Sequence, residues 1–347
     1  MERIQGLSDY VRRKDYRQAL GLPAEVAEEY RLFAQGEYNI NYIFIHPLTG
    51  KRLLLRVNCG SQMHLEDQIG YEFRALKMLE PSGRTPEAVY VDGSKRFLDH
   101  GVMVMEYLPG KALDYHKDMG LAAEILADIH STGVPEGMIP EETDLVGEQT
   151  LISSKNPLEA ILKECEQMVK TYMESPLGDE GTKRQIRKML DTGWAKIKDL
   201  SQKETYRCCI NTELNSTNFL INGPGEANYL IDWEKPLYGD PAQDLGHFLA
   251  PTTTFWKTDV ILGQSEMDAF LEDYIRAVDG RFPTDGLRER VSVFVPVTCL
   301  RGVTWCAMAW VEYQQPDRLI FNESTFRKLD AYLDGAFLED IDSLLIS

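Results

Sequence analysis

The segment INTELNSTNFLI runs over residues 210–221. Eight consecutive positions inside it, 211–218, contain one carboxylate and three asparagines. Glu213 could orient or deprotonate a hydroxyl group, and Asn218, five residues on, could offer an amide oxygen to a hard cation. Fourteen residues later, Asp232 follows an apolar run in the segment IDWE and could supply an anionic ligand. Mg²⁺ prefers a few protein oxygens together with phosphate oxygens. This spacing suits phosphoryl transfer, but a polar turn in an ordinary hairpin has the same pattern.

Phosphoryl transfer also needs groups that hold the phosphates. Gly36 and Asn39 lie in the segment AQGEYNINYIF, where backbone N–H groups could cover a phosphate, although a plain loop would look the same. Arg56 is a charge within the apolar run LLLRVN, and a buried charge is costly without a partner. Glu72, in the helix expected next, is the partner that we predict. The alternative is an Arg56 that faces outward from an edge strand.

The segment MEYLPG could lie beside a nucleotide base. It continues an apolar run and stops at Pro109-Gly110, a turn signal. Glu106 and Tyr107 would then present backbone groups to the base, whereas in the simpler interpretation they form a bare turn between two lobes.

The expected elements change in kind after residue 107. The pattern of apolar residues predicts helices at 8–33 and 64–80, a hairpin at 38–58 and strands at 87–93 and 101–107. Later helices are predicted at 121–133, at 155–202 with a break around 176–181, and over most of the chain from 244 onward. Strands first and helices later indicate an α+β chain with a small antiparallel sheet and one main helix, then a larger helical part. We place the boundary between residues 1–107 and 108–347.

Composition limits the classes of partner. The net charge of −18 disfavours nucleic acid and anionic membrane, which bind mainly through Lys and Arg, and suits a cationic small molecule, a metal-chelated nucleotide or simply solubility. The sequence has no run of 18 apolar residues, and its charged N-terminus lacks the apolar centre of a signal peptide, so we expect a cytoplasmic protein. Six cysteines without metal-like spacing are expected to be inert thiols. The sequence does not indicate an oligomeric state.

The order of these parts resembles the aminoglycoside phosphotransferase / choline kinase family. The segment INTELNSTNFLING…NYLIDWEKPLYGDPAQDLGHFL is similar to the family's usual HGDxxxxN, a strand ending in I-D-W/F-E, and GDPxxDLA. The segment GEYNINYIF is most similar to the methylthioribose kinase branch. The resemblance covers most of the chain and implies a protein-kinase-like, two-lobed fold. It also implies a kinase that uses ATP or GTP with Mg²⁺ and a small-molecule alcohol as acceptor, with the nucleotide bound by the lobe at 1–107.

The resemblance assigns a role to each matching residue. Glu213 takes the catalytic position, and Asn218 and Asp232 hold the metal. Arg56, tied to Glu72, holds the α and β phosphates. The remaining assignments are nucleotide contacts at Gly36, Asn39, Glu106 and Tyr107, and structural support of the catalytic loop by Asn211 and Asp244.

The catalytic loop departs from the family at two positions. Asn211 stands where the family has His, and Glu213 stands where it has the catalytic Asp. Because small misplacements of a catalytic group can cost about a hundredfold in rate, a nucleotide-binding pseudokinase with a regulatory or scaffolding role is the alternative function. The retained Asn218 and Asp232 favour the kinase.

The acceptor is not identified by the sequence. Trp256, Trp305, Trp310 and Tyr313 could form an aromatic wall for a quaternary ammonium, although helix-spaced aromatic residues more often belong to the core. Glu234 and Glu312 could meet an amine or could be ordinary surface charges.

Overall fold

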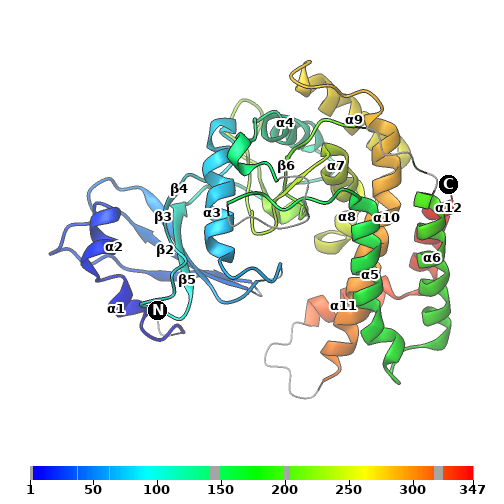
Figure 1. Cartoon of the computed structure of the whole chain (residues 1–347), viewed down its shortest axis with the longest axis horizontal. Coiled ribbons are helices and arrows are strands. Elements are labelled where there is room, and N and C mark those ends of the chain that lie inside the picture. The colour runs from blue at the N-terminus through cyan, green and yellow to red at the C-terminus, as the bar shows by residue number, and fades with distance from the viewer. Residues whose placement is uncertain are drawn as a thin grey trace.

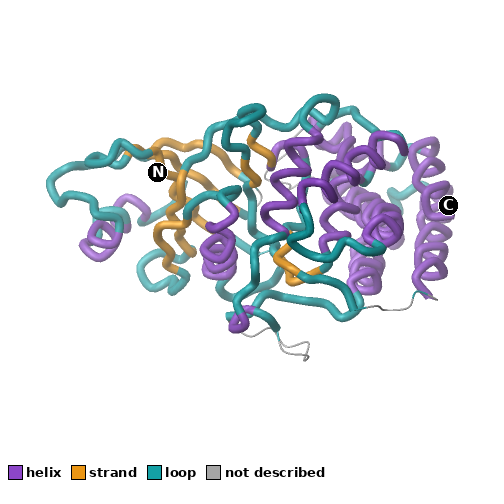
Figure 2. Tube along the Cα trace, turned by 90° about the horizontal axis from the view of Figure 1, so that it is seen from above, coloured by secondary structure: helices purple, strands orange, loops and turns teal. Residues whose placement is uncertain are grey.

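The structure of the protein is a computed structural model that describes residues 3–36, 38–61, 63–140, 149–198, 200, 204–315 and 323–346. A five-stranded antiparallel sheet lies at one end of the molecule and helices make up most of the other (Figure 1). The same separation of strands from helices is visible from above (Figure 2). The predicted α+β organisation is therefore confirmed.

The sheet has the strand order β1-β2-β3-β5-β4. Its strands are β1 (Arg31–Gln35), β2 (Asn39–Ile45), β3 (Arg52–Asn58), β4 (Ala88–Asp92) and β5 (Gly101–Glu106). The predicted hairpin is confirmed, because β2 and β3 pair in register from Asn39↔Asn58 to Ile45↔Arg52. Tyr42 and Phe44 are buried on one face of β2, as their alternation indicates.

The single helix predicted at 8–33 is wrong. The chain forms two short helices, α1 (Leu7–Tyr10) and α2 (Lys14–Ala19), and α2 stops before Gly21, whose φ of 66° is left-handed. Residues 31–35 become β1 and pair with β2 at the edge of the sheet. Every residue of β1 is exposed, so the segment lacks the alternation by which a half-buried strand is recognised.

Helix α3 (Gln68–Leu79) separates the sheet from the helical region in Figure 1. Its first turn is capped by Asp67, whose Oδ1 accepts the N–H of Gly70 at 3.0 Å. The helix packs on β4 and β5, and the 3₁₀ turn η1 (Glu80–Ser82) follows it.

The helical region is organised around α10 (Leu287–Tyr313), which packs against α5, α6, α7 and α8. The other helices are α4 (Met119–His130), α5 (Pro157–Glu174), α6 (Glu180–Lys198), α7 (Pro241–Leu249), α8 (Pro251–Lys257), α9 (Gln264–Val278), α11 (Glu323–Tyr332) and α12 (Gly335–Ile346). The predicted break is confirmed, since α5 ends and α6 begins on either side of it. Two further 3₁₀ turns are η2 (Glu136–Met138) and η3 (Ser216–Asn218).

Within the described residues, α10 is the one helix long and apolar enough to match a membrane span by length and composition. However, 67% of its most apolar window is buried inside the fold. The helix is a core element here, which explains an apolar character on all sides.

Two short strand pairs carry the loops of interest. β6 (Cys208–Ile210) pairs with β9 (Leu237–Gly239), and β7 (Phe219–Leu220) pairs with β8 (Tyr229–Leu230). The chain that leaves the sheet passes directly over β7: Gly110 has a φ of 156°, and a Cβ there would lie 2.8 Å from the backbone of Leu220. Only glycine fits this close approach.

Candidate active site

The loop that follows β6 is held by side chains instead of by a helix or sheet. The carboxylate of Asp244, on α7, accepts the backbone N–H groups of Asn211 and Thr212, each at 2.7 Å. The next two N–H groups, of Glu213 and Leu214, donate to the Asn211 Oδ1 at 2.9 Å and to a histidine. Buried backbone donors need partners, so these side chains allow an irregular loop to be buried.

Two histidines complete this support from the helices. His247 accepts the Leu214 N–H at its Nδ1 at 3.1 Å, and burial lowers the pKa of His247 to about 3. His130 contacts Asp244 through Nε2 at 3.2 Å and the hydroxyl of Tyr274 through Nδ1 at 2.7 Å. The loop therefore rests on a network anchored in α4, α7 and α9.

Two residues of the site adopt left-handed backbone conformations. Thr212 has a φ of 68° and Asp232 a φ of 66°. This conformation is rare for a β-branched residue and costs free energy unless the surroundings enforce it. Here the Thr212 N–H is fixed by Asp244 and its hydroxyl donates to the carbonyl of Lys235 at 2.9 Å. Enforced strain of this kind is concentrated at functional sites.

Three carboxylates converge next to this loop. Oxygens of Glu213, Asp232 and Glu234 lie within 4.8 Å of one another. Burial, followed by repulsion from Asp232 and then Glu213, raises the pKa of Glu234 to about 8, and burial raises the pKa of Glu213. Asn218 lies beside them, because its Nδ2 donates to the backbone oxygen of Glu213 at 2.7 Å, which leaves Oδ1 as its acceptor atom. This set of hard oxygens suits Mg²⁺.

The expected pairing of Arg56 with Glu72 is confirmed. Their side chains form a hydrogen-bonded ion pair and are only 10% and 2% exposed. The Arg56 Nε also donates to Asn41 at 3.1 Å, and its Nη1 lies 3.6 Å from the carboxylate of Asp232. Arg56 thus joins the sheet to the acidic cluster, and the outward-facing alternative is wrong.

Three backbone N–H groups that were expected near the nucleotide already donate within the fold. The N–H of Gly36 donates to Asn39 at 2.9 Å, and those of Glu106 and Tyr107 donate to Glu87 and Arg52 at 2.8 and 3.1 Å. Asn39 faces the acidic cluster, since its Nδ2 donates to Glu234 Oε2 at 2.6 Å.

The alternative that the aromatic residues belong to the core is supported. Trp256 and Trp305 meet edge to face at a centroid distance of 5.4 Å, and Trp310 meets Tyr172 at 5.9 Å. The three tryptophans pack against the main core, and Tyr172 and Tyr313 belong to it. The five buried cysteines have thiol pKa values raised by burial, which agrees with the expectation of inert thiols.

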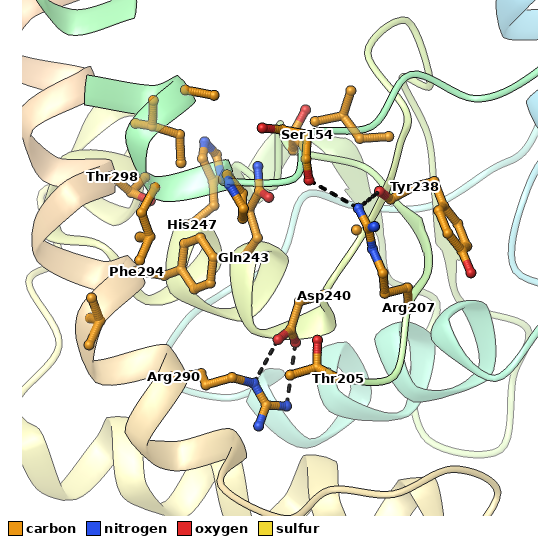
Figure 3. A pocket seen from close by; sticks show the side chains of 18 of the residues that line it. Ser154, Thr205, Arg207, Tyr238, Asp240, Gln243, His247, Arg290, Phe294 and Thr298 are labelled. Atoms are coloured by element: carbon orange, nitrogen blue, oxygen red, sulfur yellow. Dashed lines mark hydrogen bonds and ion pairs between the residues drawn. The ribbon is translucent and has the colours of Figure 1, made fainter. Parts of the chain in front are cut away.

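A cleft of about 1430 Å³ opens beside the loop of residues 211–218, which we call the catalytic-type loop. It lies between α5, α10, β9 and the segment 204–207, and Thr212 and Lys235 line the end nearest the loop. Figure 3 shows its interior, with Arg290 bound to Asp240 and Arg207 bound to backbone oxygens. Sequence reasoning missed this cleft, because its walls come from helices far apart in the chain. The one available signal was Lys235, a cation directly after IDWE.

Lys235 also lies close to Glu213, the candidate catalytic residue. Its Nζ lies 3.7 Å from the Glu213 carboxylate. Burial, followed by repulsion from Arg301, lowers the pKa of Lys235. A cation therefore stands between the acidic cluster and the cleft.

Comparison with known proteins agrees with this arrangement. A family model described as the phosphotransferase enzyme family matches residues 29–290. No curated protein matches the sequence.

Solved structures with low sequence identity show the same fold. The chain is similar to an ethanolamine kinase from Plasmodium vivax, with 15% identity over 96% of this chain and 89% of that chain and a TM-score of 0.62. It is similar to a choline kinase from Cryptosporidium parvum Iowa II, with 11% identity over 94% of each chain and a TM-score of 0.63. A spectinomycin phosphotransferase in complex with ADP and spectinomycin matches at 12% identity over 92% of each chain, with a TM-score of 0.54.

Proposed function

Because the chain belongs to the phosphotransferase enzyme family, we propose that it moves the γ-phosphoryl group of ATP or GTP to a hydroxyl of a small molecule, with Mg²⁺. The observation that carries the proposal is the convergence of Glu213, Asp232 and Glu234 beside the buried Arg56–Glu72 pair. Charge neutralisation and positioning are what this reaction asks of a protein.

The nucleotide would lie between the sheet and the catalytic-type loop. Arg56 provides a guanidinium whose position is fixed by Glu72 and Asn41, so that its remaining donors can meet phosphate oxygens. The carbonyl oxygens of Glu106 and Tyr107 can accept from a base.

The described residues fit a magnesium ion. Asp232 and Asn218 would hold it with phosphate oxygens, and Glu234 adds a third protein oxygen to the set. The raised pKa of Glu234 supports this fit, since a cation would relieve the repulsion that causes it. When bound, the ion supplies neutralisation of the charge on the transferring phosphoryl group.

Glu213 orients the acceptor hydroxyl and accepts its proton. Its backbone is fixed on both sides, by Asn211 at the N–H and by Asn218 at the carbonyl oxygen. The longer side chain therefore does not displace the loop from the acidic cluster. Because an oxygen of Glu213 still lies within 4.8 Å of oxygens of Asp232 and Glu234, the change from Asp to Glu alone does not favour a pseudokinase.

The test is nucleotide turnover. Purified protein would be incubated with Mg-ATP or Mg-GTP and a panel of small alcohols, and the nucleoside diphosphate and phosphorylated acceptor would be quantified together. We expect both products in equal amounts with at least one acceptor, and neither with the Asp232→Asn variant. Tight Mg-nucleotide binding without transfer to any alcohol would indicate the pseudokinase instead.

A further inference from the structure

We propose that the acceptor alcohol carries an anionic group, a carboxylate or a phosphate, which binds Arg207 and Lys235 in the cleft beside Glu213. This inference rests on the proposed function for the identity of the site, but its evidence is the charge and hydrogen bonding of the cleft walls.

The cleft interior is cationic in a protein of net charge −18. Among the described lining residues, four cations and two carboxylates lie below the exposed rim: Arg207, Lys235, Arg290 and Arg301, with Glu164 and Asp240. The other lining charges, including Lys155 and Glu289, are exposed. The excess of positive charge inside therefore opposes the character of the protein surface.

Both interior carboxylates are already paired. Glu164 forms two hydrogen bonds with Arg301, at 2.9 and 3.3 Å. Asp240 pairs with Arg290 at 2.6 Å and accepts the N–H of Ala242 at 2.9 Å (Figure 3). A protonated or quaternary amine in the cleft would meet two acids that are already paired with arginines, together with the further cations Arg207 and Lys235, an arrangement that disfavours it.

Arg207 is the first cation without a carboxylate. Its Nη2 donates to neutral oxygens, to Tyr238 at 2.8 Å, to Ser154 at 3.2 Å and to the hydroxyl of Ser153. Among the described residues, Nε and Nη1 have no hydrogen-bond acceptor, and no carboxylate lies within salt-bridge distance. The guanidinium is held in place by these bonds and lies over the Tyr238 ring, with its Cζ 4.9 Å from the ring centroid. Its Nε and Nη1 each keep an N–H group that can donate a charge-assisted hydrogen bond to a carboxylate or phosphate oxygen.

Lys235 is the second cation, at the catalytic end of the cleft, and its ion pair with Glu213 is a long one. Its side chain is 12% exposed, and its nearest carboxylate oxygen, on Glu213, is 3.7 Å away, beyond hydrogen-bond distance. An acceptor with an anionic group next to its reacting hydroxyl would pair with Lys235 and place that hydroxyl at Glu213.

The experiment compares acceptors that differ in charge. Glycerol, glycerate, glycerol 3-phosphate and ethanolamine would be supplied with Mg-ATP, together with polyol, sugar-acid, sugar-phosphate and amino-sugar sets of matched size. The readouts are ADP formation and the shift in melting temperature of the complex with Mg and a non-hydrolysable ATP analogue. We expect an anionic member of a set to exceed its neutral and cationic counterparts by roughly tenfold or more in kcat/KM, the size of one charged hydrogen bond.

Variants separate binding from catalysis. Arg207→Gln should raise KM for the anionic acceptor at least about tenfold with kcat within about twofold, and Arg207→Lys should recover part of the loss. Lys235→Gln should affect both parameters. Lys155→Gln, an exposed cation on the same cleft, is the control and should leave both within about twofold.

Each outcome decides one of the two proposals. Transfer that is fastest to neutral or amine acceptors overturns the anionic acceptor while the kinase stands. If no compound is phosphorylated, the proposed kinase activity fails. The anion site is still supported if anions stabilise the complex and this stabilisation is lost in Arg207→Gln but retained in Arg207→Lys. Anions that neither react nor stabilise the complex overturn the inference.

Discussion

The side-chain amide of Asn211 donates to the backbone carbonyl of Asp232 at 2.9 Å, and its Oδ1 accepts the N–H of Glu213 at 2.9 Å. One buried side chain therefore fixes the loop that carries one carboxylate relative to the turn that carries another. The amide makes both contacts at once because it has a donor and an acceptor on the same carbon.

We predict that Asn211→Ala lowers kcat by about a hundredfold, because the two carboxylates lose their mutual position. It should also destabilise the fold by about 1–3 kcal/mol, since a buried donor and acceptor lose their partner. Steady-state kinetics and thermal unfolding measure the two effects. Asn215→Ala is the matched control, because Asn215 contacts only Thr217 through its side chain within the described residues. Equal kinetic losses in the two variants would contradict the role of Asn211.

The second prediction concerns the length of the Glu213 side chain. Glu213→Gln keeps the shape but removes the base, and should lower kcat by about a hundredfold or more while nucleotide affinity stays within about twofold. Glu213→Asp should also lose activity, because the backbone is fixed by Asn211 and Asn218 and the shorter carboxylate is withdrawn from the cluster.

Turnover with a verified acceptor and equilibrium binding of Mg-nucleotide would check both substitutions. Full activity of Glu213→Gln would rule out its role as base. If Glu213→Asp is faster than the parent, the prediction for this variant is wrong. The loop would then have a position that suits the shorter Asp side chain of the family.

The third prediction concerns metal. Mg-ATP should raise the melting temperature far more than ATP with a chelator, because a ligand stabilises the fold according to its affinity for the folded state. Asp232→Asn should remove most of this difference. Asp191→Asn, which changes an exposed acid on α6, should leave it unchanged. Equal stabilisation with and without metal in the parent protein would remove the metal assignment.

Local sequence patterns predicted the parts of the fold that depend on local chemistry. The hairpin from Asn39 to Asn58 has clear alternation and a clear turn, and Arg56 within leucines requires a partner such as Glu72. β1 could not be predicted in this way, because an exposed edge strand has no periodic burial. For the candidate site, sequence spacing predicted that Glu213, Asn218 and Asp232 act together, and in the structure these side chains lie near one another.

Other parts of the site depend on tertiary structure. The cluster position of Glu234 follows from the left-handed turn at Asp232, which the sequence does not indicate. The use of the Gly36, Glu106 and Tyr107 N–H groups follows from strand register. The cleft forms where α5 and α10 meet, 137 residues apart at the Glu164–Arg301 pair.

The last prediction concerns acid stability and the support of the loop by His247. The Nδ1 of His247 accepts the N–H of Leu214, so this nitrogen is unprotonated in the folded protein, and burial lowers the pKa of His247 from 6.5 to about 3. Between these values the unfolded chain binds a proton that the folded chain does not, so stability falls as pH falls below about 6.5. For one such group the loss in the free energy of unfolding between pH 7 and pH 5 is roughly 1–2 kcal/mol.

Thermal unfolding across this pH range should therefore show a smaller loss of stability in His247→Gln than in the parent, because Gln can still accept the Leu214 N–H. His116→Gln, which changes an exposed histidine, should follow the parent curve. If His247→Gln loses as much stability as the parent between pH 7 and pH 5, the neutral buried histidine is not what supports the loop.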